Sequence, residues 1–258
     1  MSLRIKLILL AILTLAIIIV VFSLQPIPQD PVFHNFFDKR PFGGIPNFGN
    51  VVSNLPFFII GIYGLSLLNK STASGSIRWI YGCLFAGVLL ISLGSGYYHG
   101  HPDNDRLVYD RIPMTLVFMS LLTATVAEFI NLKQGARLLA LLLTIGVFSV
   151  LWWHYTESQG KGDLRLYFLV QYYPMLFIPL ILLLFRAPAH NQASRQLIWV
   201  VVWYVVAKLL EKFDQEVYSI TGMVSGHSLK HLAAAMSTWY LVRMFQLNYI
   251  PRLSGRSL

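Results

Sequence analysis

Two histidines four residues apart, His227 and His231, stand in the stretch SGHSLKHL near the start of the last apolar segment. An α-helix turns once every 3.6 residues, so both imidazoles face one side of a helix. The same spacing separates Ser95 from His99 in the stretch GSGYYHGHPDNDRLVYD, which ends at Asp110. Imidazoles in this pattern are typical metal ligands, whereas a carboxylate can move protons and a hydroxyl can stabilise an oxyanion.

The elements that must position these side chains are membrane-spanning helices. The chain is 56% hydrophobic and only 12% charged, which is too apolar for an ordinary soluble domain. A spanning helix needs about 20 mostly apolar residues. We therefore expect an all-α integral membrane protein, a seven-transmembrane-helix bundle plus one extra N-terminal transmembrane helix. The eight apolar segments are residues 6–24, 51–68, 79–99, 110–130, 137–153, 166–185, 197–213 and 228–247.

The segments predict a simple organisation along the chain. The first apolar run, of roughly 18 residues, exceeds the 7–15 residues usual for the core of a signal peptide, so we expect an uncleaved anchor. The connection that follows is rich in Pro, Gly and Phe and is expected at the membrane interface. The predicted parts are an N-terminal membrane anchor helix (1–24), an interfacial connection (25–50), a seven-helix core (51–247) and a cytoplasmic tail (248–258).

The distribution of charge predicts the orientation. With both termini in the cytoplasm, the cytoplasmic side holds eleven basic residues and one acidic residue, Glu128, and the other side holds nine basic and ten acidic residues. Such an excess of Lys and Arg is the positive-inside pattern. The net charge of +9 therefore indicates membrane orientation, and no cluster of basic residues suggests a nucleic-acid partner.

This topology brings His99, Asp110, His227 and His231 to the non-cytoplasmic side, with Ser95 one helical turn deeper than His99. Three neutral imidazoles with one open position would make a catalytic zinc site. In such a site Asp110 is the candidate to take a proton from the metal-activated water, and Ser95 is the candidate donor to the oxyanion. Candidates to orient the imidazoles are Asp103, Asp105, Asp214 and Glu216.

Each residue also has a purely structural interpretation. The histidine pair could be a helix start capped by Ser225, and Asp110 could cap its own helix. Ser95 could bond to a carbonyl of its own helix. His101 is a rival ligand, but residues two apart do not share a helical face, so we interpret it as a loop residue.

The order and spacing of these motifs resemble the alkaline ceramidase family. The matching positions are Ser95, His99, Asp110, His227 and His231, and the stretches NFGNVVSNLPF and GDLRLYFLVQYYP are similar to other segments of that family. The family belongs to a superfamily of seven-helix, zinc-dependent membrane hydrolases that includes the adiponectin-receptor type proteins. The resemblance covers about residues 45–247.

The resemblance implies a zinc held by the three histidines, with Asp110 in proton transfer and Ser95 stabilising the oxyanion. The activity implied is hydrolysis of the amide bond of a ceramide-like membrane lipid to a long-chain base and a fatty acid. One departure concerns the acidic run that provides a calcium site in some family members. Here Asn47 stands at the aligned Glu position, and Asp38 is the only carboxylate left in that stretch. We therefore expect no equivalent calcium site.

Three alternatives stay open at this stage. The same site could hydrolyse another lipid amide or an ester. The chain could be a non-catalytic receptor of the adiponectin-receptor type. Lys208, Glu211 and Lys212 on one segment suggest a transporter, although their place near a helix end allows them to reach the interface by snorkelling.

Overall fold

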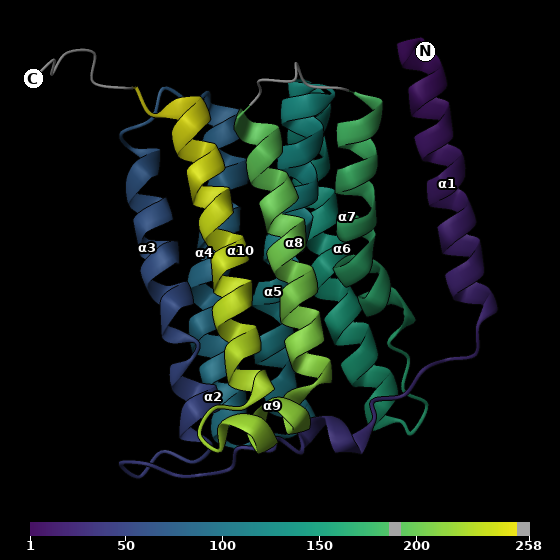
Figure 1. Ribbon diagram of the computed structural model, residues 1–258. Coiled ribbons are helices and arrows are strands. Elements are labelled where there is room, and N and C mark those ends of the chain that lie inside the picture. The colour runs from purple at the N-terminus through teal and green to yellow at the C-terminus, as the bar shows by residue number, and fades with distance from the viewer. Residues whose placement is uncertain (186–191, 252–258) are drawn as a thin grey trace, which may run out of the picture.

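The chain forms a bundle of long helices that run along one axis (Figure 1). The structure, a computed structural model, describes residues 1–185 and 192–251. Residues 252–258 of the predicted tail, and Arg186 of the charge count, lie outside the described residues. The elements are α1 (Leu3–Ser23), the 3₁₀ helix η1 (Pro31–His34), α2 (Phe48–Val52), α3 (Leu55–Leu68), α4 (Gly75–Gly100), α5 (Asn104–Phe129), α6 (Leu132–Ser158), α7 (Arg165–Leu184), α8 (Gln192–Lys212), α9 (Asp214–Thr221) and α10 (Gly226–Tyr249).

Six of the described helical segments are long and apolar enough to cross a membrane. They are α1, the combined α2 and α3, α4, α5, α6 and α7. The helices α8 and α10 have 21 and 24 residues and run alongside the others in Figure 1, but they do not meet the same apolar criterion. The all-helical architecture is therefore confirmed for the described residues, and the six candidate spans are compatible with a multi-pass membrane protein, whereas the count of seven spans plus one stays a prediction.

Several helix starts follow from short polar side chains in the sequence. The carboxylate of Asp103 accepts a hydrogen bond of 2.7 Å from the backbone amide of Arg106, and the hydroxyl of Ser225 accepts one of 3.0 Å from the amide of Ser228. Such caps satisfy amides that have no partner inside the helix. The predicted cap at Ser225 is thus confirmed. A cap at Asp110 is wrong, because α5 begins six residues earlier, directly after Asp103.

The main core lies between α3, α4, α5, α8 and α10, where large side chains such as Tyr81, Phe85 and Phe245 are fully buried. The helix α1 stands at the edge of the bundle in Figure 1 and packs against α7. Its Thr14 hydroxyl lies 2.8 Å from the Tyr173 hydroxyl. Most other side chains of α1 are exposed and apolar, as expected of a helix that faces lipid.

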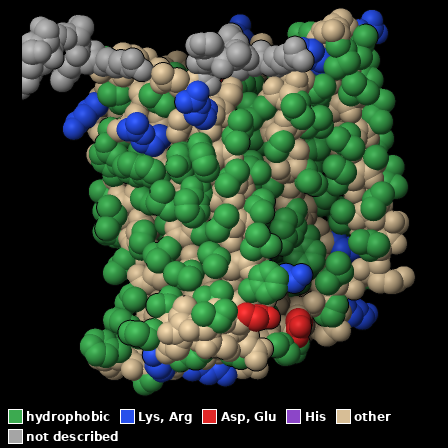
Figure 2. All heavy atoms as spheres, viewed as in Figure 1, with side chains coloured by type: hydrophobic (Ala, Val, Ile, Leu, Met, Phe, Trp, Pro, Cys, Tyr) green, Lys and Arg blue, Asp and Glu red, His purple; other side chains and the backbone are tan. Residues whose placement is uncertain are grey.

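The two ends of the bundle differ in what they carry. The start of α1 and the end of α10 lie at one end, whereas the 25–47 connection, α2 and α9 lie at the other (Figure 1). Figure 2 shows a broad hydrophobic belt between the ends, with Lys and Arg side chains gathered above and below it. We call the end that carries α2 and α9 the α9 end.

Candidate metal centre and catalytic cavity

Three buried histidines meet at the α9 end of the bundle. His99 comes from the last turn of α4, and His227 and His231 come from the first two turns of α10. Their relative exposures are 1%, 5% and 4%, and one ring nitrogen of each lies within 4.8 Å of the others. The Nε2 atoms of His99 and His227 are 3.4 Å apart. The structure thus brings together the three histidines named from the sequence, and their role as metal ligands stays a prediction.

The ring of His231 is held by residues just before α3. Its Nδ1 lies 2.8 Å from the Ser53 hydroxyl and 3.3 Å from the Asn54 amide nitrogen. The same Ser53 hydroxyl donates a 3.1 Å hydrogen bond to the carbonyl of Asn50, so its oxygen can accept a hydrogen bond from a protonated Nδ1. In that tautomer the lone pair of His231 is on Nε2, the nitrogen free to bind a metal.

The donor set fits a zinc ion. Ligands that sit 2.0–2.1 Å from a tetrahedral centre are about 3.3 Å apart, and the His99 and His227 Nε2 atoms match this spacing. Two lone pairs at that distance repel each other unless a cation or a proton lies between them. All three groups are imidazoles, which bind zinc in their neutral form, and buried hydroxyl and amide groups hold the ring of His231, as the partners of metal-bound histidines do.

An aromatic side chain of the 25–47 connection covers the histidines. The ring of Phe36 lies 4.7 Å from that of His99 and 4.4 Å from that of His227, measured between centroids. The Asn47 amide donates a 2.8 Å hydrogen bond to the backbone carbonyl of His99. The connection therefore closes the α9 end of the bundle over the imidazoles and keeps bulk water away from them.

Ser95 and Asp110 approach each other across the contact between α4 and α5. Both are buried, and the hydroxyl of Ser95 lies within hydrogen-bonding reach of the Asp110 carboxylate. The approach is close because Gly94 has no side chain: a Cβ atom there would stand 1.9 Å from the carbonyl oxygen of Tyr109. Small residues permit such tight contacts between membrane helices. Asp110 lies two turns inside α5, not at its start.

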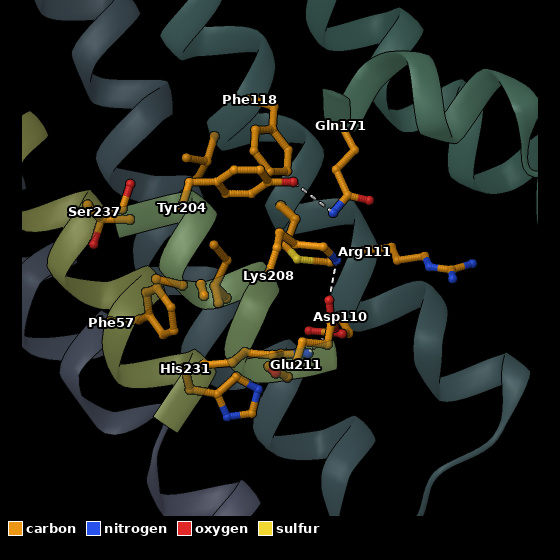
Figure 3. A pocket seen from close by; sticks show the side chains of 18 of the residues that line it. Phe57, Asp110, Arg111, Phe118, Gln171, Tyr204, Lys208, Glu211, His231 and Ser237 are labelled. Carbon is orange, nitrogen blue, oxygen red and sulfur yellow. Dashed lines mark hydrogen bonds and ion pairs between the residues drawn. The ribbon is translucent and has the colours of Figure 1, made fainter. Parts of the chain in front are cut away.

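One cavity connects these residues. Ser95, Asp110 and His231 all line it, together with apolar side chains of α3, α4, α5, α7, α8 and α10. Figure 3 shows His231 at one end, with Tyr204 and Phe118 toward the other. The cavity thus joins a polar end, next to the histidines, to an end inside the bundle that is mostly apolar but also holds the polar side chains of Gln171 and Ser237. Its apolar lining includes Phe57, Ile91, Met114, Val117, Phe118, Leu121, Met175, Val200, Ala234 and Leu241.

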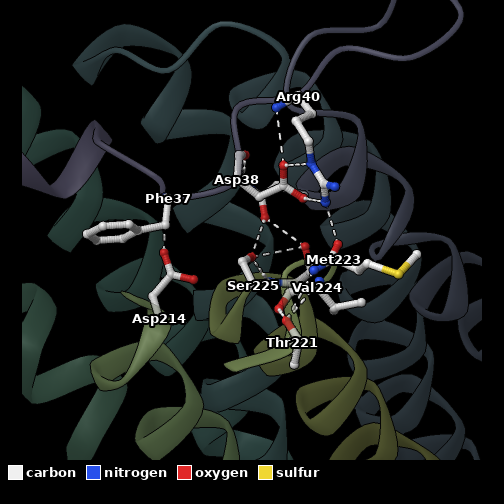
Figure 4. Close-up of polar contacts among 10 residues, drawn as sticks. Phe37, Asp38, Arg40, Asp214, Thr221, Met223, Val224 and Ser225 are labelled. Atoms are coloured by element: carbon white, nitrogen blue, oxygen red, sulfur yellow. Dashed lines mark hydrogen bonds and ion pairs between the residues drawn. The ribbon is translucent and has the colours of Figure 1, made fainter. Parts of the chain in front are cut away.

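The start of α10 is tied to the 25–47 connection by a polar network (Figure 4). The Asp38 carboxylate accepts two hydrogen bonds from the Arg40 guanidinium, at 2.8 and 2.9 Å, and the guanidinium also donates to the carbonyl of Met223. These bonds to Arg40 hold the pKa of Asp38 below its ordinary value of 3.8. Asp214 joins the connection to α10, because its carboxylate accepts from the amides of Phe37 and His227.

The four acidic residues predicted to orient the imidazoles do other work in the structure. Asp103 caps α5, and Asp105 lies 2.8 Å from Nε2 of His154. Asp214 accepts from the backbone amide of His227, at 2.7 Å, rather than from its ring. Glu216 lies in the first turn of α9 and is exposed. His101, predicted as a loop residue, follows the last residue of α4.

Two sets of side-chain contacts at the site were not predicted from the sequence. Ser53 and Asn54 contact the His231 ring, although they lie 178 and 177 residues away in the chain. The lysines Lys208 and Lys230 both pair with Glu211 on the cavity wall. The sequence analysis noted the stretch NFGNVVSNLPF and the charged residues Lys208 and Glu211, but only the packing of α3 and α8 against α10 gives these residues their partners.

Comparison with known proteins agrees with the resemblance seen in the motifs. A search among curated proteins found no match. The Ceramidase family matches the chain over residues 44–252, a range that holds all three histidines, Ser95 and Asp110. A family of this kind implies a hydrolase that acts on an amide bond of a lipid. On the evidence of this match over most of its length, the chain belongs to the Ceramidase family.

Proposed function

We propose that this protein is a zinc-dependent integral-membrane amidohydrolase that cleaves the amide bond of ceramide-like lipids to a long-chain base and a fatty acid. The observation that carries the proposal is the set of three buried imidazoles, His99, His227 and His231, beside a cavity lined by Ser95 and Asp110. When bound by these imidazoles, zinc would supply a water molecule with a pKa of roughly 7 and an electrophile for the amide carbonyl.

The side chains of this site divide the work of amide hydrolysis. The Asp110 carboxylate accepts a proton from the attacking water as the new C–O bond forms, and it delivers that proton to the amine nitrogen as the C–N bond breaks. The Ser95 hydroxyl donates a hydrogen bond to the carbonyl oxygen while this oxygen gains negative charge. Both groups lie on the cavity wall that His231 shares.

The end of the cavity next to the histidines would hold the reacting amide, and the mostly apolar end would hold an alkyl chain. Apolar walls favour a hydrocarbon chain by roughly 0.8 kcal/mol per CH₂ group removed from water. The aromatic cover by Phe36 limits the access of bulk water to the histidines. Hydrolysis of another lipid amide, or of an ester, would use the same groups.

The proposal includes an arrangement in the membrane. In it α8 and α10 also cross the bilayer, so that an anchor (1–24), a connection (25–50) and a seven-helix core (51–247) follow one another, with a tail from 248. Both termini are cytoplasmic, and the histidines face the periplasm or an organelle lumen. The support is the excess of basic over acidic residues in the parts of the sequence assigned to the cytoplasm. In addition, the start of α1 and the end of α10 lie together at the end of the bundle opposite the histidines.

Product analysis tests this function. Purified protein is incubated with ceramide, with a ceramide-derived ester and with another N-acyl amine of equal chain length, and the products are identified by mass spectrometry. We expect long-chain base and fatty acid from ceramide, and their loss in Asp110→Asn protein that still contains zinc. Zinc-loaded protein that cleaves none of these lipids would overturn the proposal and favour a receptor.

A further inference from the structure

Three charged side chains form a cluster on the wall of the catalytic cavity. Lys208 and Glu211 lie one turn apart on α8, and Lys230 lies on α10 directly before His231. Glu211 pairs with both lysines: its Oε2 atom contacts Lys208, and its Oε1 atom lies 2.7 Å from the ammonium nitrogen of Lys230. All three line the cavity, with 35%, 21% and 19% of the Lys208, Glu211 and Lys230 side chains exposed. We call them the lysine cluster.

The lysine cluster by itself has a net charge of +1, because a single carboxylate serves two ammonium groups. Asp110, the other carboxylate of the lining, interacts with the charge of Lys230, and with Arg111 the charged side chains of the lining again sum to +1. The remaining charged residue of the lining, Arg111, is a further cation. Its guanidinium bonds to Gln29 at 2.6 Å and stacks on Trp153, and it points away from the cavity in Figure 3.

Charge of one sign is costly where water is scarce. A divalent metal bound by three neutral imidazoles would make the net charge at this end of the cavity more positive still. An uncompensated cation at the edge of a membrane bundle is stabilised by an anion that it can contact directly. The wall also presents further donors to such an anion, the Tyr204 hydroxyl and the Gln171 amide, which bond to each other at 3.2 Å.

We propose that the lysine cluster is a binding subsite for an anionic group, a phosphate or a carboxylate, on the amine half of the lipid substrate. The inference rests on the proposed function and narrows its substrate class. The alkyl part of the lipid lies in the apolar end of the cavity and its amide at His231 and Asp110. An anionic group only a few bonds from the amide nitrogen would then reach Lys230, which directly precedes His231.

Ceramide and ceramide 1-phosphate with the same chains provide a matched pair of probes. Equilibrium binding and turnover of both are measured in a non-ionic detergent for the wild-type protein and for Lys208→Met, Lys208→Arg, Glu211→Gln and Lys212→Met. Lys212 is the matched control, because it lies one turn from Lys208 on α8, is exposed and does not line the cavity. A charge-assisted hydrogen bond contributes enough to change binding by about 10-fold or more.

We expect wild-type protein to bind the phosphorylated lipid at least about 10-fold more tightly than ceramide. Lys208→Met should lose this preference, Lys208→Arg and Lys212→Met should keep it, and Glu211→Gln, which makes the cluster more positive, should keep or increase it. Equal binding of both lipids by the wild type, or a preference that Lys208→Met and Lys212→Met alter equally, would overturn the inference. If neither lipid is hydrolysed, the proposed function is contradicted. The binding measurements then still decide whether the lysine cluster recognises an anionic group.

Discussion

Replacement of Gly94 by alanine tests whether the contact between α4 and α5 sets the catalytic geometry. Gly94 directly precedes Ser95, and Tyr109 directly precedes Asp110. A Cβ atom at Gly94 would lie 1.9 Å from the carbonyl oxygen of Tyr109 and 2.7 Å from its carbonyl carbon. Both are backbone atoms, so no side chain can turn aside. The two helices must move apart at the point where they carry the two proposed catalytic groups.

The size of the effect follows from this distance. Contacts under 3.0 Å essentially never occur for a Cβ atom, so the gap must open by at least 1.1 Å, the difference between 3.0 and 1.9 Å. Forcing an extra carbon into a close-packed contact costs about 1–3 kcal/mol. A displacement of about 1 Å in an active site can lower the rate roughly 100-fold. Zinc should stay bound, because α5 contributes none of the three histidines.

Gly96 on the same helix provides the matched control. An added Cβ atom there meets nothing within 4 Å, and alanine has the higher helix propensity, by up to roughly 1 kcal/mol. We expect Gly94→Ala to lower both the melting temperature and the lipid-amide turnover at constant zinc content, and Gly96→Ala to preserve all three. Equal turnover by the two variants would refute the claim that the contact between α4 and α5 positions Ser95 and Asp110 for catalysis.

Three further predictions concern single side chains. Ser53→Ala removes the hydroxyl that holds the His231 ring and should weaken zinc binding about 10–100-fold in a chelator competition. Ser66→Ala is the control, because the Ser66 hydroxyl bonds to a carbonyl of its own helix, and its zinc affinity should be unchanged. Equal zinc affinities of the two variants would contradict the role of Ser53. Asp110→Asn should retain zinc, measured by elemental analysis, and lose turnover by at least about 100-fold; a fully active variant would exclude Asp110 from proton transfer. The lowered pKa of Asp38 means that its stabilising pairing with Arg40 is complete above the ordinary pKa of 3.8 and is lost as the pH falls through the lowered value. The melting temperature of the wild type should therefore exceed that of Asp38→Asn at neutral pH, with a difference that shrinks below pH 3.8, and a difference independent of pH would contradict this pairing.

The sequence predicted the helical architecture well, because long apolar runs have few alternatives in a membrane. Helix ends were harder to place. The predicted segment 110–130 begins in the structure as α5 at Asn104, because Asp103 caps the helix in a polar stretch that apolar content alone does not mark. In α8 and α10, the lysines and histidines that build the site lower the apolar content, so these two helices are not among the six candidate spans.

The site was predictable as far as helical periodicity reaches. Four-residue spacing indicated that His227 and His231 share a face, and that Ser95 and His99 do. The partners that fix these side chains are set by tertiary packing, which a single sequence does not encode locally. Ser53 reaches His231 across 178 positions, and Phe36 covers the imidazoles from a connection without a helical period. The acidic residues near the motifs were the expected partners, but an N-terminal cap and backbone amides use them first.

The metal content of the purified protein, measured together with ceramide turnover, tests the central claim most directly. The account predicts about one zinc per chain in the wild type and little in His231→Ala. It also predicts that chelation removes zinc and turnover together and that added zinc restores both. Full ceramide turnover by metal-free protein, or undiminished zinc in His231→Ala, would contradict the assignment of the three histidines.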